Sequence, residues 1–151
     1  TVALCPRSNA VIGLDEPPVA AYLVEGNALA VGTDSLSSSP SLDLLSDVAA
    51  LHRLARAQGY AHRDLSALLL RAATLGGAHA MGLDTGPQRT GYLAVGAVAD
   101  LAFFDGDVAA PDDMIEHLVV DGAGRAAATL IDGEVRFASA VFARETGVSR
   151  D

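Results

Sequence analysis

The chain has 151 residues, half of them hydrophobic, which is enough for one sizeable core or two small ones. Ten basic and nineteen acidic residues give a formal net charge of −9 at pH 7, which argues against nucleic acid and anionic membranes as partners. The single cysteine, Cys5, excludes an internal disulfide and is typical of a reducing compartment, so we expect a cytoplasmic protein without a membrane-spanning run.

The N-terminal part predicts two parallel strands joined by a helix. Thr1–Cys5 is an apolar run that Pro6 interrupts, which indicates a buried strand followed by a loop over residues 7–9. Val19–Glu25 follows two prolines and precedes a glycine, as a short helix does. Ala28–Val31 is a second apolar run. A strand, a helix and a strand in this order favour a βαβ unit.

The next segment has helical periodicity. Apolar residues that share one helix face are spaced by three or four positions, at Leu44, Val48, Leu51 and Ala55. We expect this helix to begin at Pro40, with Ser39 as its N-cap, and to end at Gly59. Two further helices are expected over residues 64–73 and 74–82.

The C-terminal part has the pattern of a small antiparallel β unit. Strands are expected over residues 99–104, 117–120, 127–131 and 134–137, with a helical turn over 111–116. Asp132-Gly133 between the last two strands is a strong hairpin signal. The polar tail over residues 144–151 is expected to fray.

Asp34 is the most informative side chain. It stands just beyond the second predicted strand, among the hydroxyl residues Thr33, Ser35, Ser37, Ser38 and Ser39. A carboxylate at the carboxyl end of a buried strand occupies the edge where α/β barrels carry their chemistry. A turn or helix cap is the simpler interpretation of the same residue.

The end of the first strand contributes a second candidate, Arg7, which can contact an anionic or polar group of a substrate or remain a solvated loop arginine. Its neighbours Ser8 and Asn9 are expected to bond to the loop backbone. Asp43 and Asp47 have the pattern of ordinary charges on the helix surface or in its first turn.

Four short motifs occur in a fixed order along the chain. They are Cys5-Pro6-Arg7-Ser8-Asn9, Gly32-Thr33-Asp34-Ser35, Ala73-Thr74-Leu75-Gly76-Gly77-Ala78, and Gly91-Tyr92-Leu93-Ala94-Val95-Gly96 followed by Ala99-Asp100-Leu101. Together they resemble the C-terminal part of the amidohydrolase superfamily, in its metal-dependent deaminase and chlorohydrolase branch. The arginine-bearing first motif is most similar to aminofutalosine deaminases, and it also resembles guanine and adenosylhomocysteine deaminases.

The resemblance implies an α/β fold with a division of the chain into three parts. Residues 1–84 would be the last two strands and helices of a (β/α)8 TIM barrel, 85–143 the C-terminal part of a small β-sandwich, and 144–151 a tail. Asp34 would be a metal ligand, to Zn or Fe, and the catalytic proton shuttle between a metal-activated water and the leaving amine. The substrate would be a small heteroaromatic amine such as an aminated purine nucleoside, with Arg7 as a substrate-binding residue.

The rest of that metal site does not appear in the sequence. None of the four histidines, His52, His62, His79 and His117, has the His-x-His spacing of the family, and each suits a surface or packing position. Catalytic zinc needs about three protein ligands, and this chain offers one. A full barrel needs about 250 residues, more than the 151 of this chain.

We therefore expect a longer polypeptide to supply the missing N-terminal part, and Asp34 to be exposed in this chain alone. The alternative is a truncated module without catalytic activity. A homodimer is left open.

Overall fold

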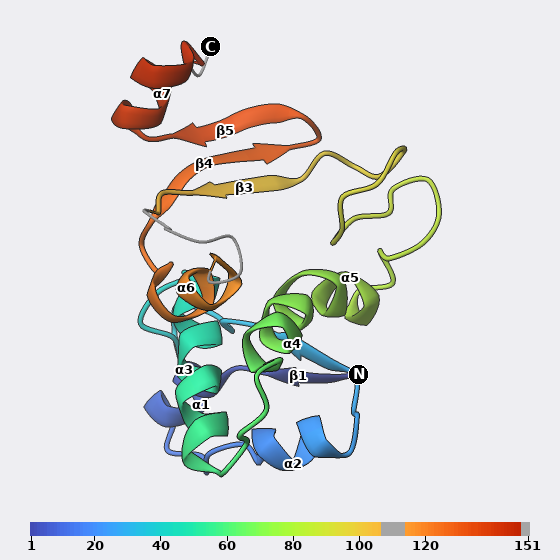
Figure 1. The fold of residues 1–151 in the computed structure, drawn as a ribbon, viewed down its shortest axis with the longest axis vertical. Coiled ribbons are helices and arrows are strands. Elements are labelled where there is room, and N and C mark those ends of the chain that lie inside the picture. The colour runs from blue at the N-terminus through green and yellow to red at the C-terminus, as the bar shows by residue number, and fades with distance from the viewer. Residues whose placement is uncertain (107–113, 149–151) are drawn as a thin grey trace.

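The computed structural model describes residues 1–106 and 114–148. Its helical part is built on two parallel strands, β1 (Val2–Leu4) and β2 (Leu29–Val31), which pair with Val2 opposite Leu29 and Leu4 opposite Val31. The connection between them contains α1 (Pro6–Val11) and α2 (Val19–Val24). Figure 1 shows both strands in the lower half of the molecule, alongside the helices that follow them. The predicted parallel βαβ unit is confirmed.

The chain turns into α1 immediately after β1, so the predicted loop over residues 7–9 is wrong. Pro6 occupies the first turn of α1, where a missing backbone N–H breaks no helical hydrogen bond and the fixed φ suits a helix. The same proline that ends the strand therefore starts the helix. This short connection keeps Arg7 and Ser8 close to the end of β1.

α3 (Leu44–Ala57) begins four residues later than predicted. Its N-cap is Asp43, whose carboxylate accepts the N–H of Leu45 at 3.2 Å. The expected cap Ser39 is buried, and its hydroxyl instead donates to the carbonyl of Ser41 at 2.9 Å. A carboxylate cap also favours the positive end of the helix dipole, so Asp43 competes well for this position.

α4 (Leu65–Arg71) runs through a π-helical turn, η1 (Ala72–Gly76), directly into α5 (Gly77–Ala80). The predicted break at Thr74 is therefore wrong. The Thr74 hydroxyl donates to the carbonyl of Leu70 at 2.8 Å, so it bonds back along the helix and does not cap a new one. The backbone of η1 packs on β2, where Gly76 meets Leu29.

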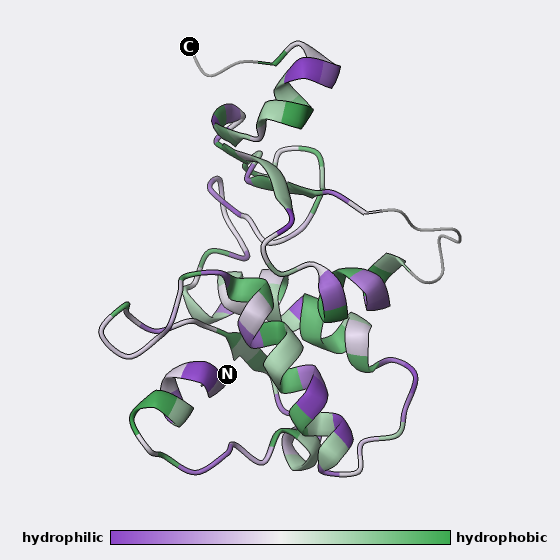
Figure 2. Ribbon diagram, turned by 90° about the vertical axis from the view of Figure 1, so that its left-hand side faces the viewer, coloured by the Kyte–Doolittle hydropathy of each residue, from purple (hydrophilic) through white to green (hydrophobic). Residues whose placement is uncertain are grey.

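The core lies between the two strands and the helices α3, α4 and α6 (Met114–Asp121). Its largest fully buried apolar side chains are Val19, Val48, Leu51, Leu65, Leu69 and Val119. The predicted apolar face of α3 is confirmed at Val48, Leu51 and Ala55, which are all fully buried. Figure 2 shows apolar colour on the helix faces that meet at this core.

Residues 117–120, predicted as a strand, lie inside α6, so that prediction is wrong. A run as short as Leu118-Val119-Val120 fits a buried helix as well as a strand, and periodicity cannot separate the two. Val119 is fully buried, and α6 packs against α3 and α4. The start of the helical turn predicted over residues 111–116 lies outside the described residues.

The C-terminal part forms a three-stranded antiparallel sheet of β3 (Leu101–Phe104), β4 (Ala126–Ile131) and β5 (Glu134–Ala138), in that order. The predicted hairpin is confirmed, because Asp132 and Gly133 adopt φ of 53° and 79° between the paired residues Ile131 and Glu134. α7 (Ala140–Thr146) follows and overlaps the predicted tail.

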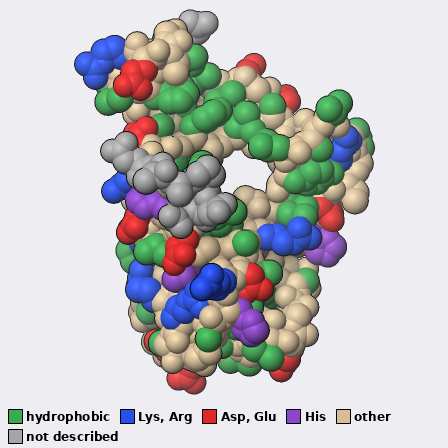
Figure 3. Space-filling model, in the orientation of Figure 1, with side chains coloured by type: hydrophobic (Ala, Val, Ile, Leu, Met, Phe, Trp, Pro, Cys, Tyr) green, Lys and Arg blue, Asp and Glu red, His purple; other side chains and the backbone are tan. Residues whose placement is uncertain are grey.

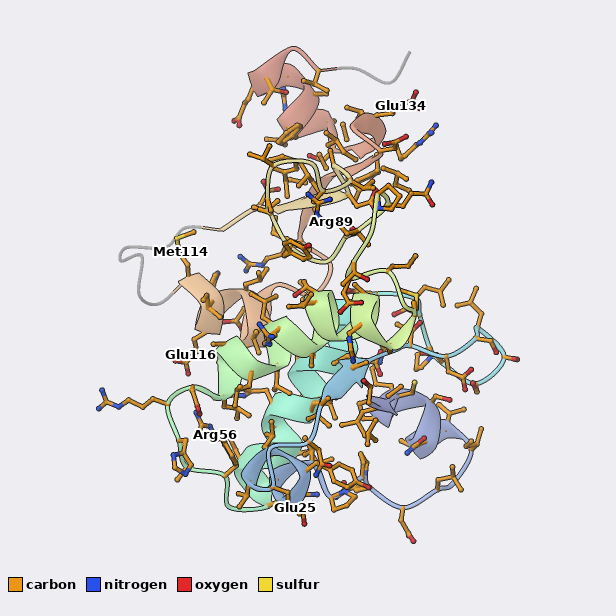
Figure 4. The ribbon with its side chains drawn as sticks, turned by 90° about the vertical axis from the view of Figure 1, so that its right-hand side faces the viewer. Glu25, Arg56, Arg89, Met114, Glu116 and Glu134 are labelled. Atoms are coloured by element: carbon orange, nitrogen blue, oxygen red, sulfur yellow. The ribbon has the colours of Figure 1, made fainter. Side chains whose placement is uncertain are left out.

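This sheet lies beyond the helical part, and α7 lies at its outer side (Figure 1). The loop from α5 to β3 is fastened by Arg89, whose guanidinium donates to the carbonyls of Gly86 and Val95 (Figure 4). Hydrophobic side chains gather on the surface of the sheet and this loop (Figure 3), including the exposed Phe103, Leu93 and Val95. In the described part of the chain, no helix has the length and apolar character to cross a membrane.

Candidate active site

The candidate site lies at the edge where both parallel strands end. β2 ends at Val31, and Asp34 follows three residues later with φ of 59°, in the left-handed region that aspartate tolerates better than most residues. Asp34 is exposed, as predicted for this chain alone. Ser8 reaches the same edge from the first turns of α1, after β1.

Three hydrogen bonds hold the Asp34 carboxylate. The Ser8 and Ser38 hydroxyls donate to its Oδ2 at 2.8 and 3.0 Å, and the backbone N–H of Ser35 donates to its Oδ1 at 2.8 Å. These donors favour the charged form, so the pKa of Asp34 lies below its ordinary value, with the Ser8 bond as the largest cause. The site therefore presents an ionised and oriented carboxylate at neutral pH.

Ser8 is a member of the site that the sequence did not indicate. Its side chain is buried, with 1% of the residue's surface exposed, and its hydroxyl contacts side chains rather than the loop backbone. The prediction of a backbone bond is wrong because residues 7–9 are helical. No local sequence pattern identifies this contact, since 26 positions separate Ser8 and Asp34.

Arg7 forms an ion pair with Asp47 of α3, with 3.4 Å between Nη1 and Oδ2. The guanidinium also donates to the Ser41 hydroxyl at 3.0 Å and the Asp43 carbonyl at 3.4 Å. About a fifth of the Arg7 side chain is exposed, at 19%. The structure therefore brings Arg7 to the strand edge but directs its guanidinium toward α3, and a substrate contact stays a prediction.

Asp47 lies in the first turn of α3, which is one of the two predicted alternatives, but it is fully buried, so the surface alternative is wrong. Burial raises its pKa above the ordinary value, and hydrogen bonds and charge from Arg7 act in the opposite direction. The sequence contains a signal for this position. Asp47, Leu51 and Ala55 are spaced by four residues, which places the aspartate on the apolar face of α3.

The four histidines do not join Asp34. His52 and His117 lie on α3 and α6, and His62 lies between α3 and α4 with its ring beside Tyr60. His79 lies on α5, where its Nδ1 pairs with Asp84 at 2.8 Å. Within residues 1–106 and 114–148, no three side chains of His, Cys, Asp or Glu come together as a metal site would require. The side chains that the structure describes therefore do not form a complete metal site.

A cavity of about 410 Å³ opens at the opposite ends of the strands. Its lining includes Asn27 and Ala28 before β2, together with Arg71, His79 and Asp84. It is therefore separate from the edge that carries Asp34.

The sequence model of the amidohydrolase family matches residues 1–136. A 5-methylthioadenosine/S-adenosylhomocysteine deaminase from Pyrococcus abyssi is 39% identical over 105 residues, which are 67% of this chain and 24% of that protein. A solved adenosine deaminase from Xanthomonas campestris with bound zinc has a TM-score of 0.74 and 30% identity, over 91% of this chain and 32% of that one.

Aminofutalosine deaminase from Helicobacter pylori has a TM-score of 0.67 at 24% identity, over 89% of this chain and 32% of that one, a likeness that indicates the fold alone. The chain thus spans 24% to 32% of the length of these proteins. The predicted family and its α/β fold are confirmed. The chain belongs to the amidohydrolase family.

Proposed function

We propose that this chain is the C-terminal share of a metal-dependent aminohydrolase that hydrolytically deaminates an aminated purine nucleoside. Residues 1–84 would supply the last two β/α units of a TIM barrel, 85–143 part of a β-sandwich, and 144–151 a tail. The observation that carries the proposal is Asp34, which is exposed, hydrogen-bonded and ionised at the carboxyl edge of two parallel strands.

Hydrolytic deamination needs a group that accepts a proton and later returns it. Water adds to the ring carbon that bears the amine, the carbon–nitrogen bond breaks, and ammonia leaves after gaining a proton. Asp34 can accept the proton of the water because its carboxylate is charged at neutral pH, and it can then donate that proton to the departing amine.

A divalent metal, zinc or iron, would lower the pKa of its bound water toward about 7. Asp34 is the one ligand that we assign to it in this chain. The other ligands would come from an N-terminal segment of a longer polypeptide, because the relatives are three to four times longer than the matched region. We also propose that this N-terminal segment pairs with the free edge of the two-stranded sheet of β1 and β2.

The names of the relatives support a nucleoside substrate with a thioether substituent, such as methylthioadenosine or adenosylhomocysteine. The first motif, residues 5–9, supports an aminofutalosine-like substrate instead. Arg7 is our proposed contact to a polar group of that substrate, at the exposed fifth of its side chain. We also propose a cytoplasmic location, in accord with the single cysteine. A non-catalytic truncated module is the alternative.

The test is release of ammonia by the full-length gene product that includes this chain, loaded with zinc or iron. Methylthioadenosine, adenosylhomocysteine and aminofutalosine are supplied in turn, and a chlorinated triazine serves as the comparison substrate. We expect metal-dependent ammonia release from at least one nucleoside. Chloride release from the triazine without ammonia from any nucleoside would favour a chlorohydrolase, and no turnover at all would favour the non-catalytic alternative.

A further inference from the structure

We propose that the buried Asp47 is a positioning residue for Asp34, and that it acts by holding α1 so that Ser8 stays hydrogen-bonded to the Asp34 carboxylate. This inference rests on the proposed function only where it concerns the reaction. The contacts themselves link three separate segments of the chain: α3, α1 and the turn after β2.

The first contact replaces a cap that α1 lacks. The first N–H groups of a helix have no partner within the helix, and Cys5 at the N-cap position supplies no side-chain bond. Asp47 Oδ1 accepts the N–H of Arg7 at 3.2 Å, and Oδ2 faces Arg7 Nη1 at 3.4 Å. A carboxylate from α3 therefore caps α1 across 40 positions of sequence.

A helix as short as α1 depends on such outside contacts. It has six residues, and short helices are marginal without tertiary packing. Val11 and Ile12 at its end are exposed, so apolar burial there contributes little. The Asp47 side chain has no surface exposed to solvent, so its carboxylate depends on Arg7 rather than on solvent for its hydrogen bonds.

The second contact transmits the position of α1 to the site. Ser8 follows Arg7 directly, and its buried hydroxyl lies 2.8 Å from Asp34 Oδ2 and 2.9 Å from the Ser38 hydroxyl. A displacement of α1 therefore moves the hydroxyl that fixes Asp34. Misplacement of a reacting group by about 1 Å can lower a rate by about 100-fold.

Asp47→Asn tests the link with little change in volume. Both carboxylate oxygens of Asp47 accept from Arg7, so an amide leaves one donor of Arg7 facing a donor. Leu51→Ala is the matched control. Leu51 lies one turn further along the same buried face of α3 and is fully buried, so its truncation destabilises the core without touching α1 by a polar contact.

The first measurement is amide hydrogen exchange of the full-length protein, followed by mass spectrometry, in peptides that cover residues 5–12 and 33–39. The second peptide contains the Ser35 N–H that donates to Asp34. We expect Asp47→Asn to speed exchange in these two segments more than in the rest of the protein, and Leu51→Ala, which destabilises the whole core, to speed it without that local preference. Ser8→Ala should loosen residues 33–39 alone, and it replaces Asp47→Asn as the test of the second contact if that variant does not fold.

The second measurement separates kcat from KM for ammonia release. We expect Asp47→Asn to lower kcat by at least about tenfold because the proton shuttle is displaced. KM should rise as well only if Arg7, which Asp47 also holds, contacts the substrate as proposed. Unchanged exchange over residues 33–39, or a kcat equal to that of Leu51→Ala, would overturn the proposal. If the wild-type protein releases no ammonia, the proposed function fails and the exchange experiment alone decides the positioning role.

Discussion

The contact between Gly76 and β2 offers a sharp test of the fold, because the next residue supplies its control. A Cβ added at Gly76 would lie 2.1 Å from the Leu29 carbonyl oxygen, whereas a Cβ added at Gly77 would meet nothing within 4 Å. Both glycines have ordinary helical φ, near −62°, so alanine fits the backbone at either position. We therefore compare Gly76→Ala with Gly77→Ala.

The expected difference follows from the two environments. Alanine in place of glycine stabilises a helix by roughly 1 kcal/mol, and this gain is shared by both variants. At Gly76 the helix or β2 must also move by more than an ångström to restore ordinary contact, which costs about 1–3 kcal/mol in a packed interior. Gly76→Ala should thus be less stable than Gly77→Ala by about 1–3 kcal/mol.

The assay is urea denaturation of the 151-residue chain, followed by circular dichroism at one fixed low concentration. The difference between the two variants is the quantity of interest, since association and helix propensity affect both alike. Equal midpoints, within about 0.5 kcal/mol, would refute the packing of η1 on β2.

Three further outcomes are expected. The 151-residue chain alone should release no ammonia from aminated purine nucleosides even with added zinc or iron, because the described residues offer one ligand where about three are needed; turnover that Asp34→Ala removes would contradict this. The isolated chain should associate and bind apolar dyes, because Ala3 on the strand edge and the apolar loop and sheet residues are exposed, and sedimentation as a dye-free monomer would count against the open edge. The pKa of Asp47 in the folded chain lies above the ordinary value of 3.8, so the folded state binds this proton more tightly than the unfolded state. The free energy of unfolding should therefore fall as pH rises from 3.8 through the raised pKa, and then level off. The stability of wild type relative to Asp47→Asn, from urea midpoints, should therefore decrease with pH across that window, and an increase would show that Arg7 outweighs burial.

Local patterns were sufficient where a single strong preference decided the structure. The two apolar runs became parallel strands, Asp132-Gly133 became a hairpin, and Asp34 lies exposed at the strand edge. Each strand and the hairpin depend on residues close together in sequence, and the parallel pairing follows from the helical connection between the strands. The four motifs identified the family because they occur together in a fixed order, and each of them is a local stretch of sequence.

Other features required tertiary information. Pro6 suits both the end of a strand and the start of a helix, and only packing decides that α1 begins there. Residues 118–120 have no periodicity that separates strand from helix until α3 and α4 cover them. The link from Asp47 through Arg7 and Ser8 to Asp34 joins positions 26 to 40 apart, so no local pattern could indicate it.

The most direct test of the central proposal is the kcat of the full-length gene product for ammonia release, compared between wild type and Asp34→Asn. Asparagine has nearly the same volume, its oxygen can accept from the Ser35 N–H and its amide can donate to the Ser8 hydroxyl, but it cannot carry the proton. Asp100→Asn is the control, because Asp100 is an exposed carboxylate that accepts the Asp132 N–H at the start of β3. We predict a fall of about 10²–10⁴ in kcat for Asp34→Asn, with an unchanged circular dichroism spectrum, and near wild-type turnover for Asp100→Asn. A rate for Asp34→Asn within a few-fold of wild type would contradict the assignment of Asp34 as the proton shuttle.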